Sequence, residues 1–408
     1  MTEPAQRLDQ TGFDLVIEHP AMLTTGDEIE LLRAAVKRNP DAAALKFKLA
    51  VGLLQLDAFD ETIELLESLA TDAPDFGTLI NLSFAYLSRE TPEDDARALD
   101  YAGKAKDIAV SDAQRASALA VAGKVRARQG DIDDARAILQ HALTVDPANK
   151  DAFKRLAALD IAAERPDRVV ALADSLLAQG VCHPRLIAAQ ILALAKQGKI
   201  AEAHEAAGLD RLLYRRELTP PEGWTLEAFN AAVRDELRAN RGLRYDRYGT
   251  ASMRTWRLDQ PALVNAVMMP QLQALIRDAV LDYIESIAGD DHPWVALGPN
   301  GGLLHNWCVM TDAEGFETWH VHQFGWISGV YYVDVPEAVT KGDDNGGCIA
   351  FGIPDDMVGE EVAAAFGEIV VRPTPGLLML FPSHSYHRTF AHGADERRIC
   401  LAFDIQPR

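Results

Sequence analysis

A repeat with a period of 34 residues constrains the first half of this chain more than any other feature. The segments "ETIELLESLATDAPDF" and "DDARAILQHALTVDPAN" align, because both place small or apolar residues and then a proline at the same spacing. Pro40 and Pro74 lie 34 residues apart, and Gly130 and Gly198 lie 68 apart, which is twice that period. Such a period favours stacked copies of one unit over an irregular helical bundle. The aligned positions are Thr62, Leu69 and Pro74 in the first segment and Ala135, Ala142 and Pro147 in the second.

The length of the repeat and its residue types are those of the tetratricopeptide repeat, which is a pair of helices. Alanine at fixed helical offsets lets neighbouring helices approach closely, and the proline ends the second helix. The copies are degenerate, and one carries an insertion around "SRETPEDD". We expect an N-terminal extension at residues 1–24, then about five repeats over residues 25–212 that form a concave surface for a peptide or protein partner.

The segment from residue 211 to residue 257 carries ten arginines and no lysine. These arginines either pair with the acidic surface of the protein or form a basic rim that attracts an anionic substrate. Within the segment, "TLEAFNAAVRDELRAN" predicts an amphipathic helix that begins after Thr225, and residues 264–288 predict another. We assign residues 213–292 to a helical connector that supports the domain following it. The arginines are Arg211, Arg215, Arg216, Arg234, Arg238, Arg241, Arg244, Arg247, Arg254 and Arg257.

Composition and charge exclude several classes of function. The formal net charge of −21 repels phosphate backbones, so we expect no binding to nucleic acid or to anionic membranes. The longest apolar run, "LIAAQILALA", is about half the length that a bilayer requires, and the first residues do not form a signal peptide. The four cysteines lie far apart and form no CxxC pair, which argues against a disulfide framework. We therefore expect a cytoplasmic protein.

From about residue 293 the helical pattern gives way to short apolar segments rich in β-branched and aromatic residues. Examples are "SGVYYVDV", "LLMLFPS" and "RICLAFDI", and clusters such as "TKGDDNGG" and "PTPG" separate them. This spacing predicts a β-sandwich or jelly roll over residues 293–408. The expected fold class is therefore α+β with two domains, an N-terminal α-solenoid of tetratricopeptide-like repeats and a C-terminal jelly roll with supporting helices.

Two histidines precede one of these strands. His320 and His322 are separated by one residue, so on an extended segment both side chains point to the same side. Burying two neighbouring imidazoles is costly unless something uses their nitrogens, and metal coordination is the natural use. Arg398 opens the apolar strand "RICLAFDI", where a buried guanidinium needs an anion, unless the strand is an exposed edge. The candidates for a third metal ligand are His384, His387 and His392 in "FPSHSYHRTFAHG".

The segment from about residue 293 to residue 408 resembles the 2-oxoglutarate/Fe(II) oxygenase superfamily. More narrowly, it resembles bacterial oxygenases that carry tetratricopeptide repeats in front of the catalytic domain. The matching stretches are "HVHQFGWISGVYYVDVP", "GCIAFGIP", "RPTPGLLMLFPSHSYHRTF" and "RRICLAFDIQP", in that order. The resemblance implies a double-stranded β-helix (jelly roll) that binds Fe(II), consumes 2-oxoglutarate and O₂, and hydroxylates a C–H bond.

The resemblance also implies roles for individual residues. His320 and His387 fall on the two iron-binding histidines, and Arg398 falls on the basic residue that holds the far carboxylate of 2-oxoglutarate. Tyr332 falls where a related subgroup places a tyrosine hydroxyl on that carboxylate. The usual motif is HxD or HxE, but His322 stands in the carboxylate position, which makes the site one negative charge poorer. Iron would then be bound either by three imidazoles or by two imidazoles and water.

Three hypotheses follow for the function. The first is a hydroxylase acting on a protein or peptide that the repeats help to dock. The second is the same chemistry on a small metabolite, with the repeats serving assembly. The third is a non-enzymatic repeat scaffold with a cupin-like metal site. A structural metal site has no need of a carboxylate clamp, so Arg398 and Tyr332 argue against the third, and the repeats favour the first.

Overall fold

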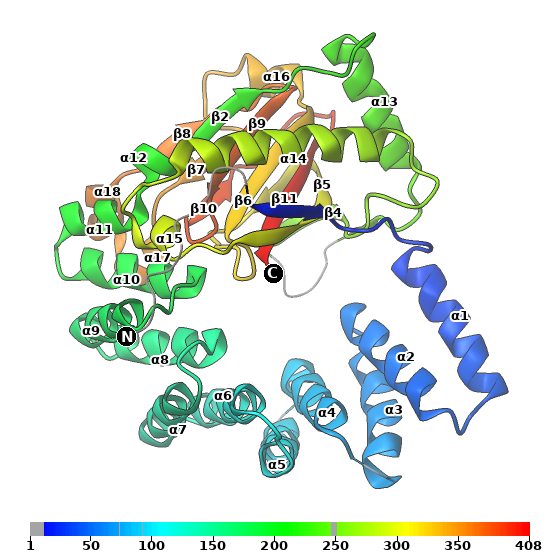
Figure 1. The fold of residues 1–408 in the computed structure, drawn as a ribbon, viewed down its shortest axis with the longest axis vertical. Helices are drawn as coiled ribbons and strands as arrows, with labels where there is room; N and C mark the ends of the chain where they lie inside the picture. The colour runs from blue at the N-terminus through cyan, green and yellow to red at the C-terminus, as the bar shows by residue number, and fades with distance from the viewer. Residues whose placement is uncertain (1–11, 73, 92, 246–250) are drawn as a thin grey trace. The chain divides into compact units, whose positions relative to one another are not determined.

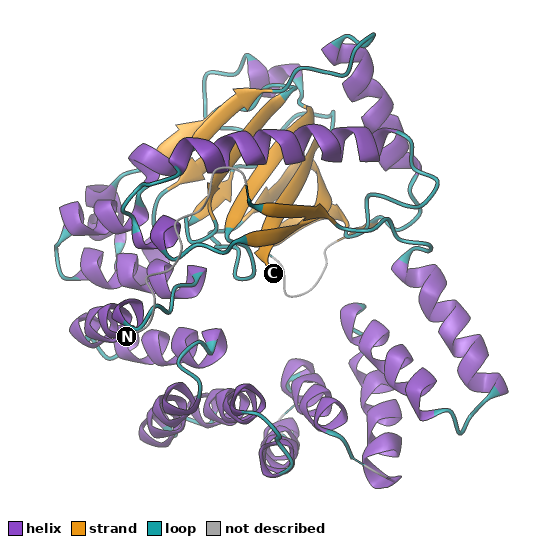
Figure 2. Cartoon of the chain, in the orientation of Figure 1, coloured by secondary structure: helices purple, strands orange, loops and turns teal. Residues whose placement is uncertain are grey.

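The computed structural model describes residues 12–72, 74–91, 93–245 and 251–408 (Figure 1, Figure 2). Its contacts divide the chain into two units. Unit 1 combines the N-terminal segment up to Thr24 with Pro166–Arg408, and unit 2 is Thr25–Arg165. The predicted fold class is confirmed, because helical repeats precede a mainly antiparallel β region. The domain limits expected at residues 24, 212 and 292 stay predictions. None of the described helices is long and apolar enough to cross a membrane.

Unit 2 consists of helices of 13 to 17 residues, each packed on the next along the chain. The small residues expected at the close contacts are buried, since Ala135 and Ala142 are both 0% exposed. Gly123 allows a close approach between its own helix and the next one, because a Cβ there would lie 2.7 Å from the side chain of Leu139. Small residues therefore set the spacing of the helices. These are α1 (Thr25–Arg38), α2 (Ala43–Gln55), α3 (Phe59–Asp72), α4 (Phe76–Arg89), α5 (Asp94–Asp107), α6 (Asp112–Arg128), α7 (Ile132–Val145) and α8 (Lys150–Ala162).

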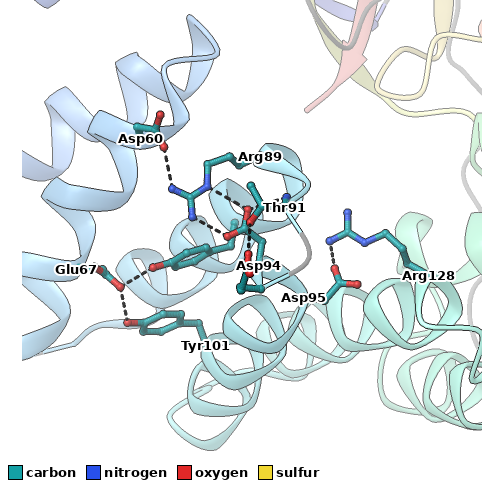
Figure 3. Close-up of polar contacts among 10 residues, drawn as sticks. Asp60, Glu67, Arg89, Thr91, Asp94, Asp95, Tyr101 and Arg128 are labelled. Carbon is teal, nitrogen blue, oxygen red and sulfur yellow. Dashed lines mark hydrogen bonds and ion pairs between the residues drawn. The ribbon is translucent and has the colours of Figure 1, made fainter.

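A polar network holds the chain where the repeat carries its insertion, between α4 and α5 (Figure 3). The guanidinium of Arg89 donates to both carboxylate oxygens of Asp94, at 3.0 and 2.6 Å, and to Asp60 on α3 at 2.8 Å. The side chain of Asp94 is 1% exposed and also accepts the backbone N–H of Thr91. The hydrogen bond from Arg89 is the main cause that lowers the pKa of Asp94 to about 2. The insertion is thus fixed by an ion pair, since its carboxylate stays charged at neutral pH.

Unit 1 is built on a large sheet with the strand order β2-β9-β6-β11-β5-β4-β3, and β1 pairs with β5 in parallel. A smaller sheet has the order β10-β7-β8. All the other strand pairs are antiparallel, so most of unit 1 has the two-sheet arrangement expected from the sequence. The strands are β1 (Asp14–Ile17), β2 (Tyr214–Glu217), β3 (Arg244–Tyr245), β4 (Ser252–Leu258), β5 (Gly301–Glu317), β6 (Ile327–Asp334), β7 (Ile349–Phe351), β8 (Ile369–Val371), β9 (Leu377–Pro382), β10 (His387–Thr389) and β11 (Arg398–Pro407).

Helices support the large sheet of unit 1. In Figure 1, α14 lies across the strands, and its buried positions recur every three or four residues, as in Leu272, Ile276 and Val280. The helix predicted after Thr225 is α13, and the Thr225 hydroxyl accepts the backbone N–H of Ala228 at its first turn. The described helices of unit 1, whether or not they contact the sheet, are α9 (Pro166–Ala178), α10 (Pro184–Lys196), α11 (Ile200–Ala207), α12 (Leu209–Leu212), α13 (Leu226–Ala239), α14 (Met268–Ile287), α15 (Pro293–Ala296), α16 (Glu337–Thr340), α17 (Asp355–Val358) and α18 (Glu360–Phe366).

Candidate metal centre

Three histidines meet where the two sheets of unit 1 approach each other. His320 and His322 lie between β5 and β6, and His387 opens β10. The backbones of His320 and His387 exchange two hydrogen bonds of 3.0 and 3.1 Å, and the backbone N–H of His322 donates to the carbonyl of Ser383. One nitrogen from each ring lies within 4.8 Å of the others. Strand pairing thus brings His387, rather than His384 or His392, to the two neighbouring histidines.

Each of the three rings is oriented by a hydrogen bond at Nδ1. In every case the partner is an oxygen that can only accept, so Nδ1 carries the proton. In the neutral form of such a ring, the Nε2 atom carries the lone pair that can bind a metal. The contacts are His320 to the carbonyl of Thr318 at 2.7 Å, His322 to Oδ1 of Asp404 at 2.6 Å, and His387 to the carbonyl of Ser385 at 2.9 Å.

Burial keeps two of these imidazoles neutral. Desolvation, followed by repulsion from the neighbouring His322, lowers the pKa of His320 to about 3. The pKa of His387 lies well below its ordinary value for the same reason, with desolvation again the largest cause. Neutral imidazoles that converge through free Nε2 atoms fit a divalent transition metal such as Fe(II). The donor set of the cluster is therefore consistent with the metal that the sequence resemblance implies.

Asp404 is a site residue that sequence reasoning missed. Strand β11 places it behind His322, where it is 5% exposed and also accepts the hydroxyl of Ser328 at 2.7 Å. A carboxylate that orients a metal-binding histidine raises the basicity of that ligand. Asp404 therefore supplies the negative charge that the HxH motif lacks, but it contacts the ligand His322 and not the metal position itself. The signal in the sequence was a single aspartate inside the apolar strand "RICLAFDI", because such a group needs a partner when buried.

Arg398 lies on the same face of β11, since residues two apart on a strand share a face. It is 2% exposed, and it donates to the carbonyl of Gly347 at 2.7 Å and to the hydroxyl of Thr389 at 3.4 Å. Within the described residues its Nε atom has no hydrogen-bond partner. A buried guanidinium with an unused donor is a suitable place for a carboxylate.

One cavity of about 250 Å³ joins the histidine cluster to Arg398. Tyr332 on β6 also lines it and is 1% exposed, and burial raises the pKa of its hydroxyl, which therefore stays a neutral donor. The cavity thus brings together every residue that the sequence singled out as a ligand or as a cosubstrate contact, namely His320, His322, His387, Arg398 and Tyr332.

The other histidines considered in this region have different partners. His384 is fully buried, with its Nε2 atom 3.2 Å from the carbonyl of Ala207. His392 contacts the carbonyl of Thr311 through Nε2, and His305 contacts the carboxylate of Glu18. These rings are engaged in hydrogen bonds outside the histidine cluster, so of the three candidates for a third ligand only His387 lies beside His320 and His322.

Two family models match the chain. Residues 305–404 match the model described as "Putative 2OG-Fe(II) oxygenase", where 2OG is 2-oxoglutarate, and residues 126–190 match the model of the tetratricopeptide repeat. The resemblance inferred from the sequence is thereby confirmed for both parts of the chain. The first match contains the histidine cluster, Tyr332 and Arg398, and its last residue is Asp404.

No curated protein is similar enough to the chain to count as a match. Among solved structures, a thermophilic TPR protein of Thermus thermophilus is 25% identical, covers 38% of this chain and 82% of its own, and has a TM-score of 0.32. A Pseudomonas putida prolyl-4-hydroxylase is 15% identical, with coverages of 52% and 99% and a TM-score of 0.33. The type IV pilus biogenesis factor PilW is 19% identical, with coverages of 46% and 87% and a TM-score of 0.38. Similarity at this level carries no functional weight.

Proposed function

We propose that this protein is an Fe(II)- and 2-oxoglutarate-dependent dioxygenase that hydroxylates a protein or peptide substrate. The observation that carries the proposal is the single cavity in which three oriented imidazoles face a buried guanidinium with an unused donor. A metal site that serves only structure has no use for the second group. The match to the oxygenase family model supports the same conclusion.

The three histidines would hold the iron through their Nε2 atoms. Fe(II) with 2-oxoglutarate and O₂ supplies the oxidising chemistry, in which a substrate C–H becomes C–OH and 2-oxoglutarate leaves as succinate and CO₂. Backbone carbonyls fix the rings of His320 and His387, and a carboxylate fixes that of His322. This arrangement orients the three ligands before the metal arrives.

Arg398 would bind the carboxylate of 2-oxoglutarate that lies far from the metal, and Tyr332 would donate its hydroxyl to the same group. Both side chains are nearly inaccessible to solvent, which strengthens a charge-assisted hydrogen bond. Apolar side chains, among them Val330, Ile349 and Phe381, line the rest of the cavity and limit the access of water. The protein thereby positions the bound groups and limits their contact with water, and the bound groups supply the reactivity.

The repeats support a macromolecular substrate, because arrays of this kind usually present a surface that holds a peptide. A cavity of about 250 Å³ is smaller than the roughly 300–1,000 Å³ of sites that enclose a drug-sized ligand. Such a cavity accommodates 2-oxoglutarate and one group of side-chain size, as a docked peptide would present. A small metabolite of the same size is the alternative, and the repeats would then serve assembly.

The proposed chemistry is tested by measuring succinate release from the full-length protein with Fe(II), 2-oxoglutarate and a panel of peptides and metabolites. We expect release that depends on a peptide and is lost in His387→Ala and Arg398→Ala. Arg397→Ala is the matched control, because Arg397 neighbours Arg398 but contacts Asp312 and does not line the cavity. Equal activity of the Arg398 and Arg397 variants would contradict the proposal. Turnover with metabolites alone would favour the alternative substrate.

A further inference from the structure

A second guanidinium, that of Arg257 on β4, lines the cavity. Its side chain is 15% exposed, and its Nε atom donates to Oδ1 of Asp259 at 2.7 Å. The guanidinium lies over the ring of Trp307, 4.8 Å from the ring centroid. Within the part of the chain that the structure describes, neither Nη atom makes a hydrogen bond. Arg257 is therefore held in place from two sides while its fork of N–H donors stays unused.

The position of Arg257 differs from that of Arg398. Arg257 pairs with Val309 on β5, whereas Arg398 on β11 pairs with Thr311, so the two arginines lie two strands apart. At about 4.8 Å between neighbouring strands, the separation across the sheet is roughly 10 Å. Their partners also differ, since Arg398 donates to Gly347 and Thr389, whereas Arg257 donates to Asp259. The cavity therefore contains two guanidinium groups that are held by different residues.

Arg257 is also close to the histidine cluster. The ring centroid of Trp307, on which the guanidinium lies, is 5.4 Å from that of His322. Trp307 thus lies next to both the guanidinium of Arg257 and a predicted metal ligand. An anion bound by Arg257 would hold the atoms a few bonds away from it near the metal, which is the position of a substrate rather than of a distant effector.

Arg257 differs from the other arginines of the arginine-rich segment. Among the members of this segment that the structure describes, which exclude Arg247, only Arg257 lines the cavity. Most of the others pair with acidic side chains, which is the first of the two interpretations drawn from the sequence. The pairs outside the cavity are Arg211–Asp290, Arg216–Asp282, Arg234–Asp235, Arg238–Asp334, Arg244–Asp259 and Arg254–Glu314.

The cavity holds another carboxyl group, that of Glu317, but it does not occupy the fork of Arg257. Glu317 instead accepts the hydroxyl of Ser252 at 2.6 Å. Burial also raises the pKa of Glu317. The carboxylate hydrogen-bonded to Arg257 is thus Asp259, and it accepts from the Nε edge.

We infer that Arg257 binds a carboxylate of the substrate, so that the substrate of this oxygenase is an acid. The inference rests on the proposed function and names the chemical class of its substrate. The acid is either a small organic acid or an acidic side chain of a peptide, because both present the same planar group to the fork.

The test uses full-length protein loaded with Fe(II) and 2-oxoglutarate without oxygen, and calorimetry to measure the dissociation constants of two probe pairs. One pair is hexanoate and hexanamide, and the other is acetyl-Gly-Glu-Gly-amide and acetyl-Gly-Gln-Gly-amide. We expect the charged member of at least one pair to bind about 10-fold or more tightly than the neutral member. The pair that shows this preference tells whether the acid is small or part of a peptide.

Arg257→Gln should abolish the charge preference and leave the affinity for 2-oxoglutarate unchanged, whereas Arg257→Lys should keep part of the preference. Arg397→Gln is the matched control. Arg397 also stacks on a tryptophan, Trp256 at 5.2 Å, and pairs with an aspartate, Asp312, but it does not line the cavity. This control should behave as the parent protein does.

The inference is overturned if neither charged probe binds at millimolar concentration, if both pairs bind without regard to charge, or if the preference survives in Arg257→Gln. It is also overturned if Arg257→Gln loses affinity for 2-oxoglutarate, because Arg257 would then be the anchor of the cosubstrate. A protein that binds neither Fe(II) nor 2-oxoglutarate refutes the proposed function itself. Binding of both without charge preference refutes only the role of Arg257.

Discussion

Replacing Asp404 by asparagine tests whether this carboxylate supplies the charge missing from the HxH motif. Asparagine has nearly the same shape, so its carbonyl can still accept from His322 and from Ser328, which lie 2.6 and 2.7 Å from Oδ1. The substitution removes the negative charge alone. A hydrogen bond to a charged group contributes about 1.5–3 kcal/mol and a neutral one about 0.5–1.5 kcal/mol, so the difference is about 1–1.5 kcal/mol. Adding the lost support for ligand basicity, we expect about 10- to 100-fold weaker metal binding.

The affinity is measured by titrating Fe(II) without oxygen against a competing chelator. Glu317→Gln is the control, because Glu317 lies in the same cavity but bonds to Ser252 and not to a histidine. We expect this control to change the affinity little. Unchanged affinity in Asp404→Asn would refute the reasoning. Equal losses in the two variants would show that the total charge of the cavity matters, rather than the contact with His322.

Three further predictions concern the ligands, the cosubstrate and the stability of unit 2. His387→Ala should abolish binding of a divalent metal, and full occupancy by elemental analysis would contradict this ligand. Arg398→Ala should weaken 2-oxoglutarate binding about 10- to 150-fold and leave metal binding intact, and Arg398→Lys should recover part of the lost affinity. Both affinities are measured without oxygen from the metal-to-ligand absorption band. Asp94→Asn should lower the free energy of unfolding by about 1–2 kcal/mol at pH 7, a value reduced because the side chain of its partner Arg89 is 31% exposed. The pKa of Asp94 falls from 3.8 to about 2 on folding, so this stabilisation is complete above about pH 4 and disappears as the pH falls through about 2. Urea unfolding should therefore show that the difference in stability between parent and variant shrinks between pH 4 and pH 2. A constant difference would exclude the ion pair as its source.

The features predicted from the sequence are those that depend on neighbouring residues. Helical periodicity and the alanine positions of the repeats are local, and so is the geometry that aligns His320 with His322. Only the family resemblance distinguished His387 from His384 as a ligand. The two histidines are three residues apart, and a short turn places them in different surroundings that the local sequence does not reveal. His387 pairs with His320 across the backbone, whereas His384 points to the carbonyl of Ala207.

The residues that were missed lie on other strands. Asp404 reaches His322 because β11 lies beside β6, and Arg257 enters the cavity because β4 extends the sheet beyond β5. These neighbours are set by strand pairing over long separations, which a single sequence does not reveal. The segment "DLVI", Asp14–Ile17, is likewise too short to be recognised as a strand, and it became β1 because β5 offered a free edge.

Strand β1 has a consequence for the order in which the protein is made. The repeat unit is an insertion, because the chain begins in unit 1, passes through unit 2 and returns. Asp14 must wait for Gly301, its partner on β5, and at about 5–20 residues per second the ribosome needs roughly 15–60 s to produce it. Unit 2 leaves the ribosome in that interval, and each of its helices packs on neighbours that have also been made. The repeats can therefore fold before β1 finds its partner strand, and their removal by trimming the N-terminus would also delete a strand of the large sheet.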